Sequence, residues 1–324
     1  MSSRVIRPLA LDEAALAADL MTAAYPSEAQ DPVLTAYRWQ HPREGWVHGR
    51  FVADLDGTPA AYLEWQHGPW ERLPERHCWV EVWLVKAQMD ERVLGELWTW
   101  IEEAAAADGA LTLNAACAED EPEMLKVLTA KGYDRKRTER VWTLDLRKHG
   151  PRIAEDARAA RQRMAAAGIE LTTLDRLTDP DRFRKLHELN ELMRQDVPHT
   201  SPLLPQTLDD FMARVAAPST PPDRWWIALD AGEPVAVSYL AYPPVRGPVW
   251  TNFTGSHPAY RGRGIARAVK LQSLAQAAEL GIEEVRTDND SENKPMLHIN
   301  ETLGYELLPG YVSFEKRLPA RSLR

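Results

Sequence analysis

Alternating hydrophobic and polar positions divide the chain into two similar halves. Residues 51–85 and 225–256 each contain a strand pattern, a tight turn with Asp and Gly, a second strand pattern, a proline-containing loop and a third strand pattern. Period-two alternation between such turns is typical of an antiparallel meander. The pattern therefore predicts three consecutive antiparallel strands in each half of the chain.

The segments around each meander also correspond. A first strand and a helix-rich stretch come before it, and a helix, a short strand, a second helix, a Gly-Tyr pair and a closing strand come after it. In the first half these segments are residues 4–9, 12–24, 92–105, 110–115, 122–130, 132–133 and 138–146. In the second half they are residues 169–174, 180–193, 264–280, 284–287, 294–302, 304–305 and 311–318.

This repeat predicts an α/β (α+β) chain of two tandem domains, each a mixed, mainly antiparallel twisted sheet flanked by helices. The copies span residues 1–150 and 169–324, and the charged, Ala-rich residues 151–168 between them predict a helical linker closed by Gly168. A length of 324 residues fits this division, because domains commonly contain about 100–150 residues.

Composition and charge narrow the possible partners. A formal net charge of −9 argues against a general nucleic-acid surface. The chain has neither a secretion signal nor an apolar run long enough to span a bilayer, so we expect a cytoplasmic protein without membrane contact. Cys78 and Cys117 provide no disulfide framework and no zinc-ligand spacing, which predicts packed thiols and no bound metal.

The segment most informative about chemistry is TNFTGSHPAYRGRGIARAVK, residues 251–270, where a strand pattern runs through Gly262 and Gly264 into a helix pattern. Glycines let a ligand approach the backbone, and the first N–H groups of a helix attract anions. Arg261, Arg263 and Arg267 add positive charge. A turn with solvated arginines would give the same short pattern, but its place between strand and helix favours a pyrophosphate site.

These residues resemble the coenzyme signature of the GNAT superfamily of acyl-CoA-dependent N-acyltransferases. The signature is Gln or Arg, two residues, Gly, one residue, and Gly or Ala; Arg261, Gly264 and Ala266 match it, and Pro258 precedes them. A second family segment resembles NKPMLHINETLGYE, which begins at Asn293. The resemblance covers about residues 169–318.

The resemblance implies that acetyl-CoA, as co-substrate, lies in a V-shaped opening between the fourth and fifth strands. Backbone groups of Thr254 and Ser256 would pair with the pantetheine, and an amide near Thr254 would polarise the thioester carbonyl. Asn293 would bond the pantetheine arm or its diphosphate end. The implied coenzyme residues are Thr254, Gly255, Ser256, Arg261, Gly262, Arg263, Gly264, Ile265, Ala266 and Asn293.

The chain departs from the family pattern where acid and base are expected. The position at which many members carry a Tyr acid is Asn300, and the position at which some carry a Glu base is Trp250. Either the proton moves through water, with Asn300 bonding the sulfur, or another residue serves. Besides Thr254 and Asn300, the catalytic candidates are Glu191, Asp196 and His199, with His298 as a further possibility.

The N-terminal copy has lost parts of the signature. Arg92 and Gly95 remain, but Val93 and Leu97 replace small residues, and Glu121 or Glu123 stands near the position of the second-motif Asn. We expect this half to bind no coenzyme and instead to support the acceptor site or form part of its wall. Most of the 12 tryptophans lie here, and the spacing of Trp79, Trp83 and Trp98 predicts core packing.

The predicted function is an N-acetyltransferase that moves an acetyl or short acyl group from acetyl-CoA to a primary amine of a small metabolite or antibiotic-like molecule. The alternatives are a non-catalytic CoA-binding sensor or scaffold, an acetyltransferase similar to mycothiol synthase, and an aminoacyl transferase that uses charged tRNA, which the acidic charge disfavours. We expect a monomer or a homodimer.

Overall fold

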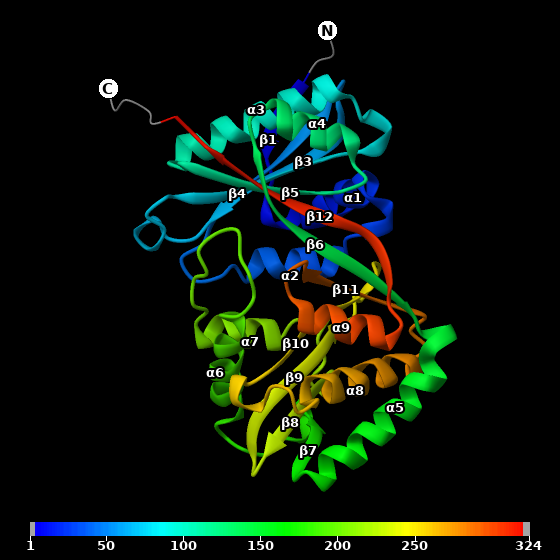
Figure 1. The fold of residues 1–324 in the computed structure, drawn as a ribbon. Helices are drawn as coiled ribbons and strands as arrows, with labels where there is room; N and C mark the ends of the chain where they lie inside the picture. The colour runs from blue at the N-terminus through cyan, green and yellow to red at the C-terminus, as the bar shows by residue number, and fades with distance from the viewer. Residues whose placement is uncertain (1–3, 320–324) are drawn as a thin grey trace.

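The predicted repeat is present in the computed structural model, which describes residues 4–319 (Figure 1). The N-terminal copy contains β1 (Arg4–Pro8), α1 (Ala14–Ala24), α2 (Pro32–Gln40), β2 (Val47–Leu55), β3 (Thr58–His67), β4 (His77–Leu84), α3 (Glu91–Asp108), β5 (Thr112–Ala118), α4 (Pro122–Ala130) and β6 (Asp134–Asp145). The C-terminal copy contains β7 (Ile169–Thr173), α6 (Arg182–Arg194), α7 (Leu208–Val215), β8 (Trp225–Asp230), β9 (Glu233–Ala241), β10 (Val249–Ser256), α8 (Ile265–Glu279), β11 (Glu284–Asp290), α9 (Lys294–Leu303) and β12 (Glu306–Arg317).

The two copies share one twelve-stranded mixed sheet, in the order β1-β2-β3-β4-β5-β12-β6-β11-β10-β9-β8-β7. Their closing strands are exchanged. β12 pairs antiparallel with β5 of the N-terminal copy, and β6 pairs antiparallel with β11 of the C-terminal copy. In Figure 1 the green β6 and the red β12 cross the middle of the molecule side by side. The repeat predicted these strands but not their exchange.

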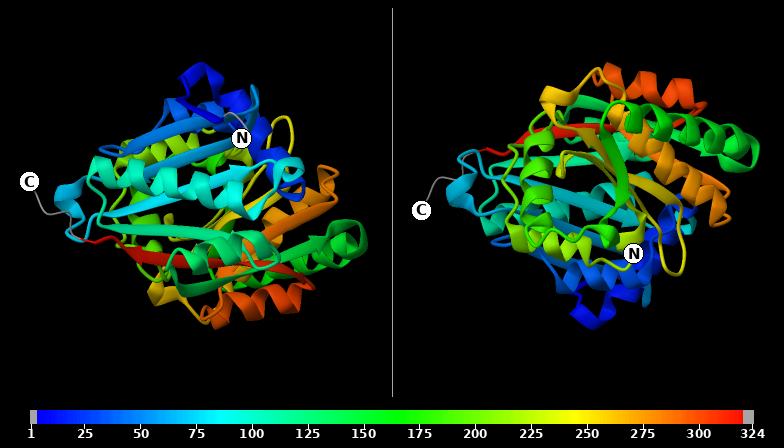
Figure 2. Two further views of the ribbon diagram at one scale, coloured as in Figure 1. Left: turned by 90° about the horizontal axis from the view of Figure 1, so that it is seen from above. Right: turned by 90° about the horizontal axis from the view of Figure 1, so that it is seen from below.

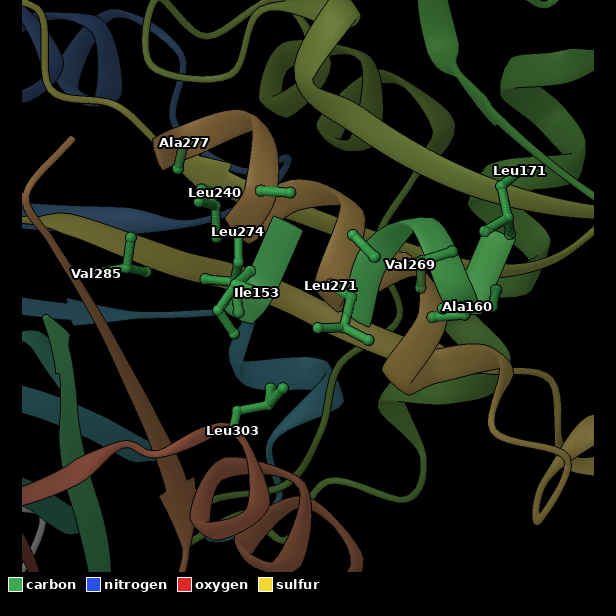
Figure 3. Packing of buried hydrophobic residues seen from close by; sticks show 14 of the residues in the cluster. Ile153, Ala160, Leu171, Leu240, Val269, Leu271, Leu274, Ala277, Val285 and Leu303 are labelled. Carbon is green, nitrogen blue, oxygen red and sulfur yellow. The ribbon is translucent and has the colours of Figure 1, made fainter. Parts of the chain in front are cut away.

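The linker between the copies is a helix, as predicted, and begins a few residues earlier than expected. In α5 (Leu146–Ala166), the N-cap carboxylate of Asp145 accepts hydrogen bonds from the Arg147 and Lys148 amides at 2.9 and 3.2 Å. One face, including Ile153 and Ala160, belongs to the same buried cluster as Leu271 and Leu274 of α8. Figure 3 shows these side chains between the two helices. The linker is therefore part of the C-terminal core.

Helix α2 contacts the opposite copy. Its N-cap residue Asp31 accepts hydrogen bonds from the amides of Val245 and Arg246 at 2.6 and 3.0 Å. The Tyr37 hydroxyl donates to the Ala213 carbonyl at 2.6 Å. In Figure 2, α1 and α2 lie on one side of the molecule, and α9 lies on the other. Helix α2 therefore links the two copies.

The sheet opens at two equivalent places. The parallel strands β10 and β11 pair only at Val249↔Val285 and Trp250↔Arg286. In the same way, β4 and β5 pair only from His77↔Thr112 to Trp79↔Asn114. Beyond these positions the strands have no pairing with each other. We call these places the C-terminal opening and the N-terminal opening.

Tryptophan packing follows the predicted pattern only in part. Trp98 is fully buried in the N-terminal core. Trp79 and Trp83 are half-buried, and their indole nitrogens donate to Glu81 at 2.9 and 3.0 Å. Trp83 nevertheless packs against the buried cluster that includes Leu20 of α1 and Tyr62 of β3, as predicted. Trp79 instead lines a cavity together with Leu204 of the other copy. Cys78 and Cys117 are buried free thiols, as predicted.

Candidate active site

The start of α8 exposes backbone amides. Gly262 and Gly264 adopt left-handed conformations, with φ of 74° and 75°, and Gly264 is the N-cap. No side chain caps this helix. The Ala268 amide bonds the Gly264 carbonyl at 3.0 Å, so the amides of Ile265, Ala266 and Arg267 precede the helical ladder. These donors, together with the positive end of the helix dipole, suit an anion.

The arginines beside this turn are oriented by neighbouring side chains. Arg261 forms an ion pair with Asp196, and Arg267 lies 3.4 Å from a carboxylate oxygen of Asp156. The Arg263 guanidinium lies 5.0 Å from the ring centre of Tyr260. Three guanidinium groups thus lie near the exposed amides at the predicted pyrophosphate position, and two of them are paired with carboxylates.

The strand leading to this turn has one free edge. Thr254 pairs with Ser238 of β9 on one side, while no pairing with β11 continues beyond Trp250. The Thr254 and Ser238 hydroxyls are 2.8 Å apart, and Ser238 contacts Ser273 of α8 at 3.2 Å. The Thr254 side chain therefore points toward α8, and its main chain borders the C-terminal opening. An extended ligand can add to such an edge like a strand.

The equivalent helix in the N-terminal copy is closed to anions. Asp90 caps α3, and its carboxylate accepts a hydrogen bond from the Val93 amide at 3.0 Å. A second carboxylate, Glu91, stands in the first turn. Leu97 is fully buried, and Gly95 lies inside the helix rather than at its cap. The Asp90 carboxylate thus occupies the N-terminus of α3, whereas the equivalent N-terminus of α8 has no capping side chain.

Beneath the C-terminal opening lies a polar network that the sequence did not predict. Asn300 is fully buried and accepts a hydrogen bond from Lys270 Nζ at 2.7 Å. Its amide nitrogen donates to Asn289 of β11 at 2.6 Å. Lys270 is itself fully buried, 4.9 Å from the ring centre of Tyr305. Burial lowers the pKa of Lys270 to about 7, although Asp288 acts in the opposite direction.

The other residues singled out from the sequence have separate surroundings. Glu191 bonds Arg194 at 2.5 Å and the Gln206 amide at 3.1 Å, and Asp196 pairs with Arg261 of the coenzyme segment. His199 is exposed, and partial burial of its ring lowers its pKa. Their proposed roles as proton carriers stay predictions.

Two further residues of the resemblance occupy helix α9. Asn293 is its N-cap, and its side-chain oxygen accepts a hydrogen bond from the Met296 amide at 3.4 Å. The amide NH₂ of Asn293 is the part of this side chain that could reach a coenzyme. His298 is exposed.

Strand exchange brings a carboxyl cluster together along the pair of strands β6 and β11. Glu139 of β6 pairs with Asp290, and Val141 pairs with Asp288. Burial, with Asp288 and Asp290 adding to it, raises the pKa of Glu139 to about 7. Although burial favours the neutral form of Asp290, its 2.7 Å hydrogen bond from Arg137 helps to lower its pKa. This cluster was not predictable from the sequence, because its members come from different copies.

Comparison with known proteins identifies the family. The model of the acetyltransferase (GNAT) family matches residues 186–305. An acetyltransferase of Sodalis glossinidius (strain morsitans) is 31% identical over 97 residues, a match that spans 30% of this chain and 67% of the relative. The chain belongs to the GNAT acetyltransferase family. It is therefore an acyltransferase, and the family match lies in the copy with the uncapped helix.

Solved structures show that the whole double fold has GNAT relatives. A tandem GNAT protein from the clavulanic acid biosynthesis pathway has a TM-score of 0.75 and 18% identity, and the similarity covers 98% of this chain and 100% of that one. A GCN5-related N-acetyltransferase from Sphaerobacter thermophilus has a TM-score of 0.69 and 19% identity, covering 99% and 98%. The tandem GNAT fold is thereby confirmed.

Proposed function

We propose that this GNAT protein transfers an acetyl or short acyl group from acetyl-CoA to a primary amine of a small molecule, with the coenzyme bound in the C-terminal opening. The observation that carries the proposal is the contrast between the two equivalent helices. The N-terminus of α8 is uncapped and flanked by arginines, whereas Asp90 caps that of α3. We expect the enzyme to act in the cytoplasm as a monomer or homodimer.

The proposed reaction needs proton transfer at two points. A neutral amine attacks the thioester carbonyl, a C–N bond forms, the C–S bond breaks, and the departing thiolate takes a proton. Glu139 suits removal of a proton from the incoming ammonium, because its pKa of about 7 leaves much of it ionised at neutral pH. The main-chain amide near Thr254 would stabilise the oxyanion.

The buried lysine supplies positive charge for the leaving group. The Lys270 ammonium polarises Asn300, which in turn bonds Asn289 on the strand that borders the opening. Asn289 is half-buried. A polarised pair of amides at this place would favour the negative sulfur that develops as the C–S bond breaks.

Calorimetric titration with acetyl-CoA tests the coenzyme site. We expect Gly264→Asp to weaken binding at least about 100-fold, because a carboxylate would replace the pyrophosphate at the amides. Gly95→Asp in α3 is the matched control and should bind normally. Weakened binding in the control but not in Gly264→Asp would contradict the proposal, because it would place the coenzyme in the N-terminal copy.

Release of free CoA thiol across a panel of amines, polyamines, aminoglycosides and amino acids tests the reaction itself. We expect turnover with at least one primary amine. Tight coenzyme binding without turnover on any amine would favour the sensor function instead.

A further inference from the structure

The N-terminal opening contains a cavity that the coenzyme proposal does not use. It has a volume of about 410 Å³, within the range typical of small-molecule sites. Val82 and Trp83 of β4 line one side, and Cys117 of β5 lines the other. Leu308 and Tyr311 of the exchanged strand β12 also contribute to its wall. The cavity thus exists where the two strands separate and is completed by the other copy.

Carboxylates dominate the charged lining of this cavity. Glu28, Glu81, Asp120 and Glu121 contribute to it, and Arg286 is the cationic residue among the lining side chains. Two of these carboxylates have cationic partners, because Arg286 lies 3.5 Å from Glu28 and Lys86 bonds Glu121 at 3.1 Å. Arg286 also bonds Glu284 at 2.8 Å. The four lining carboxylates still outnumber the two cations paired with them. An anion would therefore meet repulsion here, whereas a cation would be attracted.

Aromatic rings surround the same space. Tyr25 and Trp83 meet at right angles, with ring centres 5.2 Å apart, and Tyr311 lies on β12. Glu81 accepts hydrogen bonds from both Trp79 and Trp83, which fixes the orientation of the Trp83 indole. Aromatic faces next to carboxylates are suited to an organic cation, because a ring attracts the charge and also covers the apolar part of the ligand.

The cavity extends toward the C-terminal opening. Its lining includes Val141, which pairs with Asp288 of β11, and Arg286 of the same strand. Arg286 pairs with Trp250, the last position before β10 and β11 separate. Asp288 is near enough to both Tyr311 and Glu28 to contribute to their raised pKa values, in each of which burial is the largest cause. A ligand in this cavity therefore points one end at the strand that borders the proposed coenzyme site.

We propose that this cavity is the acceptor site, and that it takes a primary ammonium ion carried on an aromatic or apolar body, with the nitrogen directed toward Asp288. This inference rests on the proposed function and adds the class of its acceptor. The N-terminal copy would then have kept its strand opening and replaced a nucleotide ligand by an amine.

Calorimetry on the full-length protein tests the site without any turnover. The probes are tryptamine and its neutral analogue tryptophol. We expect tryptamine to bind at least 10-fold more tightly than tryptophol, and Asp120→Asn and Glu121→Gln each to weaken tryptamine binding 3- to 10-fold. Glu170→Gln, an exposed carboxylate on β7, is the control and should leave it unchanged. Equal binding of both probes would overturn the proposal.

A cavity-filling variant separates this site from the coenzyme site. Ala116→Leu narrows the cavity and should abolish tryptamine binding while acetyl-CoA binding stays normal. If that variant does not fold, Asp120→Asn carries the same test, because its exposed side chain leaves packing intact. Displacement of tryptamine by CoA in Gly264→Asp would overturn the proposal, since the cavity would then be a second coenzyme pocket. Loss of coenzyme binding by Gly264→Asp with tryptamine binding kept would support both sites independently.

Discussion

Lys270 is a fully buried lysine, and its ammonium group has no access to water. Such burial is tolerated only when partners replace the lost hydration. Asn300 provides one hydrogen bond, and the Tyr305 ring faces the charge. The low pKa of this lysine should therefore appear in the stability of the protein.

Lys270→Met tests this through pH. In the native protein the pKa of Lys270 is about 7, whereas the pKa of a lysine in an unfolded chain is about 10.4. Between these values the unfolded chain binds more protons, so native stability rises with pH across this window and the full penalty is present below pH 7. The variant lacks this term, and its stability relative to the wild type should fall by about 2–3 kcal/mol between pH 7 and 9. Urea unfolding at both pH values measures the difference in unfolding free energy between the variant and the wild type. A difference that stays constant with pH would contradict the prediction.

Glu139 gives a second prediction at the residue scale. As a base it must be ionised, so wild-type activity should rise with pH through about 7, the pKa that burial and its acidic neighbours produce. Glu139→Gln should lower kcat about 100-fold and remove this rise, while acetyl-CoA affinity stays normal. Glu301→Gln, exposed on α9, is the control for the pH–rate profile. An unchanged profile in Glu139→Gln would exclude this residue as the base.

Among the elements, the two helices that follow the openings show how similar folds acquire different ligands. The helix α8 begins at a left-handed glycine, and α3 begins at a capping aspartate. The glycine turn before α8 was predicted from the sequence, because a glycine turn and a helix start are local features. The same holds for the meanders and for most helix limits. The capping role of Asp90 was not predicted, since the lost signature was attributed to Val93 and Leu97.

Features that depend on tertiary structure were not predictable. Lys270 is preceded by alanine and valine in a helix, where a lysine normally reaches solvent. It is buried because α8 packs against α5 and the sheet, and Asn300 of α9 bonds its ammonium group. Glu139 is separated from Asp288 by a long stretch of sequence, and an exchanged strand brings them together. Helices α2 and α7, of 9 and 8 residues, were also missed, although α4 with 9 residues was predicted.

Removing the cap of α3 tests whether the cap alone excludes a coenzyme. Asp90→Ala should destabilise the protein by about 1 kcal/mol, the usual effect of losing an N-cap. It should not create acetyl-CoA binding, because Val93 and Leu97 still deny the close backbone approach that Gly264 allows. Urea unfolding and calorimetry measure the two effects. New binding in the variant would show that the capping carboxylate was the main barrier.

Across the whole molecule, the exchanged strands join the copies more firmly than the linker does. β12 pairs with β5 over seven register positions, from Tyr311↔Ala118 to Arg317↔Thr112, and β6 and β11 pair over another seven. We therefore expect the halves to stay together without covalent continuity through α5.

A cut in the linker tests this arrangement. A protease site inserted at Gly168, an exposed position between α5 and β7, should allow cleavage into two fragments. We expect the fragments to elute together in gel filtration and to separate only in denaturant. Separation in native buffer would show that the exchanged pairing is too weak to hold them.

The exchange also imposes an order on how the protein is made. The ribosome releases β5 and β6 long before β12. Until then the nascent N-terminal copy has an open sheet edge at β5, and such an edge is prone to pair with other chains. The first half is therefore completed only after β12 has been synthesised, and losing residues 306–317 would damage the copy that was synthesised first.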